Sequence, residues 1–170
     1  LPDAQNRETT AEITAFAHEH GVSVEAELGE VGGKNGVHDP SARTNPEDAA
    51  KFVADTGVDL LAVAVGSSHA MATREAVLDN QLIAAIHELV PVPLVLHGSS
   101  GVPDEGMVAA IQAGMTKINV STHLNVVFTQ GVRQILDENP KIVDPRKYVG
   151  PATHLVQEEV ERLMRLYAQA

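Results

Sequence analysis

Length, composition and charge exclude several classes of protein. The chain has 170 residues, 44% of them apolar and only 3% aromatic, which fits one globular domain with a core of Ala, Val, Leu and Ile. A formal net charge of −11 argues against general affinity for nucleic acid or an anionic membrane. No apolar run reaches the ~18 residues of a membrane span. Because the chain has no Cys and no signal peptide at its start, we expect a cytoplasmic protein.

Helix and strand signals alternate along the chain. Short runs rich in branched residues predict buried strands, and apolar residues at helical spacing between them predict helices that end at Gly or begin at a cap such as Asn45-Pro46. In chain order we expect a helix at 6–20, the strand Val22–Leu28, a helix from Pro46 to Gly57, the strand Leu60–Val65, a helix around Leu82–Leu89, the strand Pro93–His97, the helix Asp104–Ala113, the strand Lys117–Val120, and the helices Leu124–Glu138 and Ala152–Ala168.

This alternation predicts an α/β fold with a parallel sheet and right-handed crossovers. The sheet could be open and doubly wound, or it could be part of a (β/α)₈ TIM barrel. A full barrel usually needs ~250 residues, so four strands make about half of one. Polar residues lie at the C-terminal end of every predicted strand, which favours the barrel because barrel active sites lie at that face. These residues are Glu25, Glu27, His69, His97, Asn119, Ser121 and Thr122.

Two histidines follow neighbouring strands in the same way. His97 ends the run Pro-Leu-Val-Leu and precedes Gly98-Ser99-Ser100-Gly101, and His69 ends Val65-Gly66-Ser67-Ser68. Neutral imidazole is a good ligand for zinc, and two rings at adjacent strand ends could share one ion. The alternative for each is a hydrogen-bonded structural histidine.

The small residues after His97 predict a phosphate site. Gly98–Gly101 exposes backbone N–H groups, Ser100 adds a hydroxyl, and a predicted helix begins just beyond, near Asp104. An ordinary Gly-Ser turn is the alternative. In the strand Lys117–Val120, Asn119 and then Ser121 should face the barrel interior, where anion binding would explain their polarity.

Two carboxylates, Glu25 and Glu27, should point inward from one strand, where a cation would offset the cost of their burial. A salt bridge to Lys117 is the alternative explanation. The polar loop from Gly32 to Thr44, which contains Gly33, Gly36, His38, Asp39 and Pro40, fits either a mobile lid or plain disorder.

Five segments together resemble the class II, metal-dependent ketose-bisphosphate aldolases, a family that includes fructose-bisphosphate and tagatose-bisphosphate aldolases. They are "VSVEAELGEVGG", "TNPEDAAKFVADTGVDLLAVAVGSSHA", "PVPLVLHGSSGVPDE", "AGMTKINVSTHLNVVFT" and "DPRKY". The resemblance implies a (β/α)₈ barrel of which residues 1–170 supply strands five to eight. It also implies a preceding stretch of roughly 100 or more residues with the first four strands, the remaining zinc ligand, a histidine, and an Asp acid/base.

The resemblance also implies roles for residues of this chain. His69 and His97 would bind Zn²⁺, with Glu27 beside the metal as a catalytic residue, either supporting the ligands or acting as an alternative ligand. The substrate phosphate would lie against Ala70, Gly98, Ser99, Ser100, Asn119, Ser121 and Thr122, with help from a monovalent cation (Na⁺ or K⁺). The expected reaction is reversible cleavage of a ketose 1,6-bisphosphate, in glycolysis or related carbohydrate metabolism, by a homo-oligomer (dimer or tetramer).

This sequence departs from the family pattern at a few positions. Ala70 stands where the family usually has Gly, and Ser121 stands where fructose-bisphosphate enzymes often have Asp and tagatose-bisphosphate enzymes Ala, so the sugar stays open. Lys34 and Asn35 replace acidic residues of one branch, which puts an acid/base role of the lid in question. Two other readings stay open: a Schiff-base aldolase that uses Lys117, and a non-catalytic barrel fragment.

Overall fold

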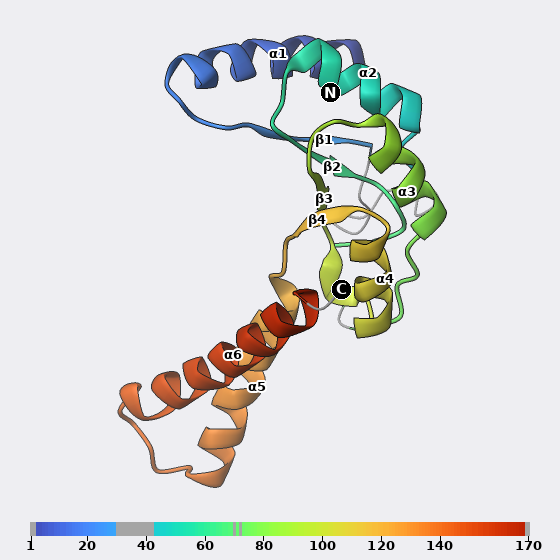
Figure 1. Ribbon diagram of the computed structural model, residues 1–170. Coiled ribbons are helices and arrows are strands. Elements are labelled where there is room, and N and C mark those ends of the chain that lie inside the picture. Colours follow the sequence, from blue (N-terminus) through green and yellow to red (C-terminus); the bar gives the residue numbers. More distant parts are fainter. Residues whose placement is uncertain (1–2, 30–42, 70, 72, 169–170) are drawn as a thin grey trace.

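The computed structural model describes residues 3–29, 43–69, 71 and 73–168. Its centre is a four-stranded parallel sheet in the order β1-β2-β3-β4, which follows the order of the chain (Figure 1). The strands are β1 (Glu25–Leu28), β2 (Leu60–Val63), β3 (Leu94–Leu96) and β4 (Met115–Ile118). Consecutive parallel strands joined by helices are the repeating unit of a (β/α) barrel.

The helices between the strands pack on one face of the sheet. They are α2 (Pro46–Thr56), α3 (Asn80–Leu89) and α4 (Asp104–Gln112), whereas α1 (Asp3–Glu19) precedes β1 and packs against α2. The main hydrophobic cluster joins alternate strand residues to buried residues of these helices, and its largest members include Phe52, Leu61, Ile83, Ile86, Leu94, Leu96 and Met107. Complete burial of each such side chain contributes roughly 1.5–3 kcal/mol.

The opposite face of the sheet carries the other alternate residues. The strand register places Glu27 opposite Ala62, and Ala62 opposite Val95. Val95 in turn lies opposite Lys117 of β4. This face therefore changes from apolar residues in its middle to charged residues at its edges, and the polar residues that follow the strands lie at its C-terminal end.

Local capping explains where the best-defined helix begins and ends. The Asn45 side chain accepts a hydrogen bond from the Asp48 backbone N–H at 3.0 Å, and Pro46 occupies the first turn. Gly57 ends the helix in the left-handed conformation, with φ +69°. The expected limits of this helix are therefore confirmed.

The last two helices form a hairpin that projects from the sheet (Figure 1). They are α5 (Thr122–Glu138) and α6 (Arg146–Tyr167). At their crossing, a Cβ on Gly131 would lie 2.7 Å from a methyl of Leu155 and 3.4 Å from the Cα of Ala152, so a larger residue there would require the Leu155 side chain to move. No helix in the described residues is long and apolar enough to span a membrane.

Several predicted boundaries are wrong. The first strand begins at Glu25 rather than Val22, the first helix at Asp3 rather than Asn6, and α5 at Thr122 rather than Leu124. The fourth strand is Met115–Ile118 rather than Lys117–Val120, so Asn119 and Ser121 lie in the turn after the strand. The last helix begins at Arg146 rather than Ala152. Pro151 lies inside this helix because packing against α5 maintains the helical path where the local sequence predicts a start.

Candidate metal and anion site

His97 follows β3 and lies between the two carboxylates of β1. Its Nδ1 is 2.6 Å from Oε2 of Glu27, and its Nε2 is 3.0 Å from Oε1 of Glu25. The ring is partly buried, with 21% of its side chain exposed. The rigid strand and the two carboxylates therefore fix the orientation of the imidazole.

His69 lies beside His97 because the two loops approach each other closely. Gly98 has φ +67°, and a Cβ at this position would lie 2.7 Å from the Ser68 carbonyl and 3.1 Å from the His69 nitrogen. A side chain at position 98 would push these loops apart. The two imidazole rings lie 6.0 Å apart between centroids, tilted by 48°.

Glu27, His69 and His97 form a cluster that could hold a metal ion. Each offers one ligand atom, and these atoms all lie within 4.8 Å of one another. Ligand atoms around a tetrahedral zinc ion lie about 3.4 Å apart, given bonds of ~2.0–2.2 Å, so small side-chain rotations would bring all three to one ion. Two imidazoles and a carboxylate suit zinc well.

Glu25 and Glu27 both contact His97, but only Glu25 also pairs with a lysine. The Nζ of Lys117 donates to Oε2 of Glu25 at 2.9 Å and to Oδ1 of Asn119 at 2.6 Å. Partial burial raises the pKa of Glu25, but the hydrogen bonds and charges of Lys117 and His97 outweigh it and hold this pKa below its ordinary value. The salt bridge considered from the sequence therefore involves Glu25, while Glu27 faces the histidines. A lysine engaged in this way is a poor Schiff-base nucleophile.

A pocket of about 230 Å³ opens next to this cluster. It contains both histidines and most of the residues predicted to bind phosphate. Its lining is His69, His97, Gly98, Ser99, Ser100, Asn119, Ser121 and Thr122. Ala70, the remaining residue of the prediction, lies outside the described residues.

The hydroxyls of the two serines in this loop form different hydrogen bonds. Ser99 begins the short 3₁₀ helix η1 (Ser99–Gly101), and its Oγ donates to the Asn119 carbonyl at 2.6 Å. The Oγ of Ser100 accepts the backbone N–H of His123 at 3.1 Å. Because a hydroxyl has one proton and two lone pairs, Ser100 keeps its proton for a ligand, whereas the proton of Ser99 is already used.

The helix whose N-terminus borders the pocket is α5. Ser121 and Thr122 at its start line the pocket, and the positive end of the helix dipole together with free N–H groups makes such a terminus favourable for anions. The sequence suggested the helix at Asp104 for this role, but no residue of α4 lines the pocket, and Asp104 pairs with Arg74 and Arg162. The Ser-Thr pair before Leu124 is the capping signal that would have placed the start of α5 correctly.

A charged pair next to the pocket was not found from the sequence. The Nε2 of His123 lies 2.7 Å from Oε1 of Glu159, and Arg162 donates to both oxygens of Glu159 at 2.8 Å. The hydrogen bond from Arg162 lowers the pKa of Glu159 most; partial burial opposes it and the bond to His123 assists it, and the pKa falls to about 2. His123 and Glu159 are 36 positions apart, with no local motif to connect them.

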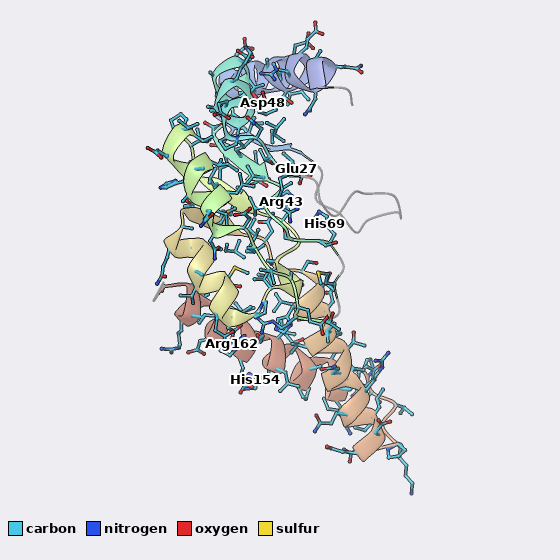
Figure 2. All side chains as sticks on the ribbon, turned by 90° about the vertical axis from the view of Figure 1, so that its right-hand side faces the viewer. Glu27, Arg43, Asp48, His69, His154 and Arg162 are labelled. Carbon is cyan, nitrogen blue, oxygen red and sulfur yellow. The ribbon has the colours of Figure 1, made fainter. Side chains whose placement is uncertain are left out.

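Figure 2 labels two residues of the cluster and one residue of α6. Glu27 and His69 lie near each other, whereas Arg162 lies on α6 beyond the sheet (Figure 2). Of the predicted lid, Gly32–Thr44, only Arg43 and Thr44 belong to the described residues. The Oγ1 of Thr44 donates to the Leu28 carbonyl at 2.7 Å and accepts the N–H of Ala64 at 2.8 Å, which attaches the end of this segment to the sheet.

Comparisons with known proteins show the family and the fold of this chain. All of residues 1–170 match the family model described as fructose-bisphosphate aldolase class-II. The chain is similar to the YdjI aldolase from Escherichia coli K12, with 33% identity and a TM-score of 0.73 over 95% of this chain and 54% of that one. It is also similar to a putative fructose-1,6-biphosphate aldolase from Coccidioides immitis, with 29% identity and a TM-score of 0.83 over 99% of this chain and 60% of that one.

A third structure bears on the fold alone. The fructose-bisphosphate aldolase from Campylobacter jejuni is 23% identical, with a TM-score of 0.80 over 97% of this chain and 57% of that one. The chain thus spans less than two thirds of the length of these relatives. The structural matches confirm the predicted fold, with the four parallel strands forming part of an aldolase TIM barrel. Because the family model matches from the first residue to the last, the chain belongs to the class II fructose-bisphosphate aldolase family.

Proposed function

We propose that this chain is the C-terminal half of a TIM-barrel enzyme and carries part of the site of a metal-dependent aldolase. The reaction is the reversible cleavage of a ketose 1,6-bisphosphate to dihydroxyacetone phosphate and an aldehyde. The observation that carries the proposal is the cluster of Glu27, His69 and His97, whose ligand atoms lie within 4.8 Å of one another, directly beside a pocket for an anion. The metal cluster would lie at the carbonyl end of the three-carbon unit that the reaction releases, and the pocket would lie at its phosphate end.

In this proposal His69 and His97 hold Zn²⁺, and Glu27 supports His97 or serves as an alternative ligand. When bound, the metal supplies Lewis-acid stabilisation of the negative charge that develops on C–C bond cleavage. The chain's own contribution is to fix the ligands: Glu27 holds Nδ1 of His97 at 2.6 Å, and Gly98 allows the loop of His69 to approach. A further zinc ligand and the acid/base are expected from the part of the barrel outside this chain.

The pocket between the loop after β3 and the start of α5 binds the substrate phosphate. Backbone N–H groups of the loop and the first turn of α5, with the hydroxyls of Ser100, Ser121 and Thr122, supply the donors. Gly98, Ser99 and Asn119 complete the wall, Ala70 contributes its backbone, and a monovalent cation (Na⁺ or K⁺) offsets part of the phosphate charge. Holding the phosphate fixes the reacting carbons relative to the metal ligands, which lowers the entropic cost of reaction.

The cellular setting is part of the same proposal. We infer a cytoplasmic homo-oligomer, a dimer or tetramer, that acts on a phosphorylated ketose in carbohydrate metabolism such as glycolysis, without nucleic-acid or membrane partners. Ser121 lines the pocket and leaves both fructose- and tagatose-bisphosphate as substrates.

The test is a cleavage assay of the full-length protein with both sugar bisphosphates. We expect activity that EDTA abolishes and Zn²⁺ restores, and a loss of at least about 10²-fold in the His97→Ala variant, because the change removes a metal ligand. The control is His154→Ala: this histidine is on α6, 66% of its side chain is exposed, and it pairs only loosely with Glu158 at 3.5 Å. Full activity in His97→Ala, or in EDTA, would contradict the proposal.

A further inference from the structure

A chain of ion pairs links α6 to the wall of the phosphate pocket. We use the term ion-pair chain for Arg74, Asp104, Arg162, Glu159 and His123 together. Its central residue is Glu159, which lies 2.7 Å from Nε2 of His123 and accepts two hydrogen bonds of 2.8 Å from Arg162. Only 16% of the Glu159 side chain is exposed, so solvent screens these contacts less than it screens a surface pair.

One end of the ion-pair chain reaches the phosphate pocket through α5. His123 is in the first turn of α5, directly after the pocket residues Ser121 and Thr122. Its backbone N–H donates to Oγ of Ser100 at 3.1 Å. The side chain of His123 is thus held by α6 while its backbone orients Ser100. A movement of His123 would therefore displace donors on both walls of the pocket.

The other end holds the segment that follows His69. Arg162 contacts Oδ2 of Asp104 at 2.6 Å, and Asp104 also pairs with Arg74. Arg74 donates to the Val102 carbonyl at 2.8 Å and 3.1 Å. The same five residues therefore connect the loops after β2 and β3 to α6 as one unit.

We propose that Glu159 is a positioning residue of the phosphate pocket: by holding His123 it keeps the first turn of α5 and the hydroxyl of Ser100 in the geometry that binds the phosphate of the substrate. This inference rests on the proposed function and extends it to a residue outside the pocket. Glu159 does not touch the ligand, so its substitution should weaken phosphate binding while leaving the metal ligands in place.

The surroundings of Glu159 separate this role from general stabilisation of the fold. Without Glu159, Arg162 keeps its contact with Asp104 at 2.6 Å, and the backbone N–H of His123 keeps its bond to Ser100, so only the imidazole of His123 loses its described partner. The attachment of α6 also depends on apolar contacts of Leu163 and Ala152, which are 6% and 0% exposed. We therefore expect the Glu159 variants to fold.

The experiment measures binding of inorganic phosphate to the full-length, zinc-loaded protein by isothermal titration calorimetry, together with KM and kcat for cleavage. In Glu159→Ala we expect the Kd for phosphate and the KM to rise about tenfold, with kcat within about twofold. Glu159→Gln, which keeps an acceptor for His123, should recover most of the affinity. Glu161→Ala is the matched control, because Glu161 forms a surface pair with Arg165 on the same helix with 58% of its side chain exposed.

A second variant tests the link itself. His123→Ala should raise the Kd for phosphate as much as Glu159→Ala does, and the double variant should be no worse than either single variant, because both remove one connection. If Glu159→Ala unfolds at the assay temperature, His123→Ala alone carries the test, and an unchanged Kd for phosphate in that variant would contradict the inference.

Two outcomes would overturn the inference, and they differ in what they imply for the phosphate pocket. If the unsubstituted protein binds phosphate and Glu159→Ala binds it equally well, Glu159 has no positioning role, although the pocket assignment stands. If the unsubstituted protein does not bind phosphate, the pocket assignment fails and the inference fails with it.

Discussion

Gly98 is the residue that allows the loops after β2 and β3 to meet. A Cβ at this position would be strained by the φ of +67° and would also lie 2.7 Å from the Ser68 carbonyl. Gly98→Ala should therefore lower the free energy of unfolding by about 2–4 kcal/mol, from backbone strain of ~1–2 kcal/mol plus overpacking. Urea denaturation measures this change, and a zinc titration should show weaker binding because His69 is displaced.

The matched control is Gly21→Ala. Gly21 has nearly the same φ, +68°, but no atom lies within 4 Å of a Cβ built there. Its substitution should cost only the backbone strain and leave zinc binding unchanged. Equal losses of stability in the two variants would show that the close approach of Gly98 to Ser68 does not contribute to the cost of the Gly98 substitution.

The two serines of η1 should respond oppositely to substitution. Ser99→Ala removes a buried hydrogen bond to the Asn119 carbonyl and should lower the free energy of unfolding by about 1–2 kcal/mol. Ser100→Ala removes only the longer bond from the His123 N–H and should cost less stability, about 0.5–1 kcal/mol, but it also removes a donor that faces the pocket and should raise the KM about tenfold. Urea denaturation and steady-state kinetics on both variants check this, and a larger KM effect in Ser99→Ala would contradict it.

At this scale the sequence indicated residue types and strand ends, but not partners. The small residues around His69 and His97 were visible as repeated local patterns, so both histidines could be proposed as ligands. The division of Glu25 to Lys117 and Glu27 to His97 could not be predicted, since it depends on the stagger of four strands. The pair His123–Glu159 was missed for the same reason: its members meet only through packing of α5 and α6.

At the scale of the elements, the strands buried by helices were the most predictable. β2 and β3 lie within their expected ranges because their branched residues are buried on both faces. The edge strand β4 is less clearly marked: Thr116 and Lys117 are exposed, so its apolar signal is weak and the prediction began two residues late. For α6, the predicted start at Ala152 follows Gly150 and Pro151. The helix begins earlier, at Arg146, because contacts with α5 maintain it through these two residues.

The stability of the folded protein should depend on pH through Glu159. Its pKa falls from 4.5 to about 2 in the folded protein, first because of the Arg162 hydrogen bond. A lowered folded-state pKa adds stability that is fully present above the unfolded pKa, here about 4.5, and is lost as the pH falls toward 2. Glu159→Gln should therefore lower the free energy of unfolding by about 2 kcal/mol at pH 7, and the difference should vanish near pH 2.

Chemical denaturation of both proteins between pH 7 and pH 2 measures this difference. Glu161→Gln serves as the control, because its surface pair with Arg165 is largely exposed and such pairs contribute little. A difference between Glu159→Gln and the unsubstituted protein that is independent of pH would show that the Glu159 charge is not responsible.

At the scale of the whole molecule, the two faces of the sheet differ in polarity and in what covers them. One face packs against helices, while the other carries Glu25, Glu27 and Lys117 beside small residues. In the described part of the chain, β1 pairs only with β2, and β4 pairs only with β3, so each outer strand offers one edge for pairing. The relatives, of which this chain covers 54–60%, are TIM barrels, and closing the barrel would occupy both edges.

The 170 residues on their own should therefore associate through these edges. Unpaired backbone groups of an edge strand form hydrogen bonds with other strands, and the charged inner face lacks the opposite wall of a barrel. In analytical ultracentrifugation, we expect the isolated chain to sediment as species heavier than 18.0 kDa, with a weight that rises with concentration.

Addition of a polypeptide that carries the remaining barrel strands should reverse this association. A complex in a one-to-one ratio should form, with a single cooperative unfolding transition, because both edges are then paired. A monodisperse species of 18.0 kDa that unfolds cooperatively without that addition would contradict the prediction. It would mean that contacts within these four β/α units, including the ion-pair chain and the α5–α6 hairpin, are enough to stabilise the sheet without closure.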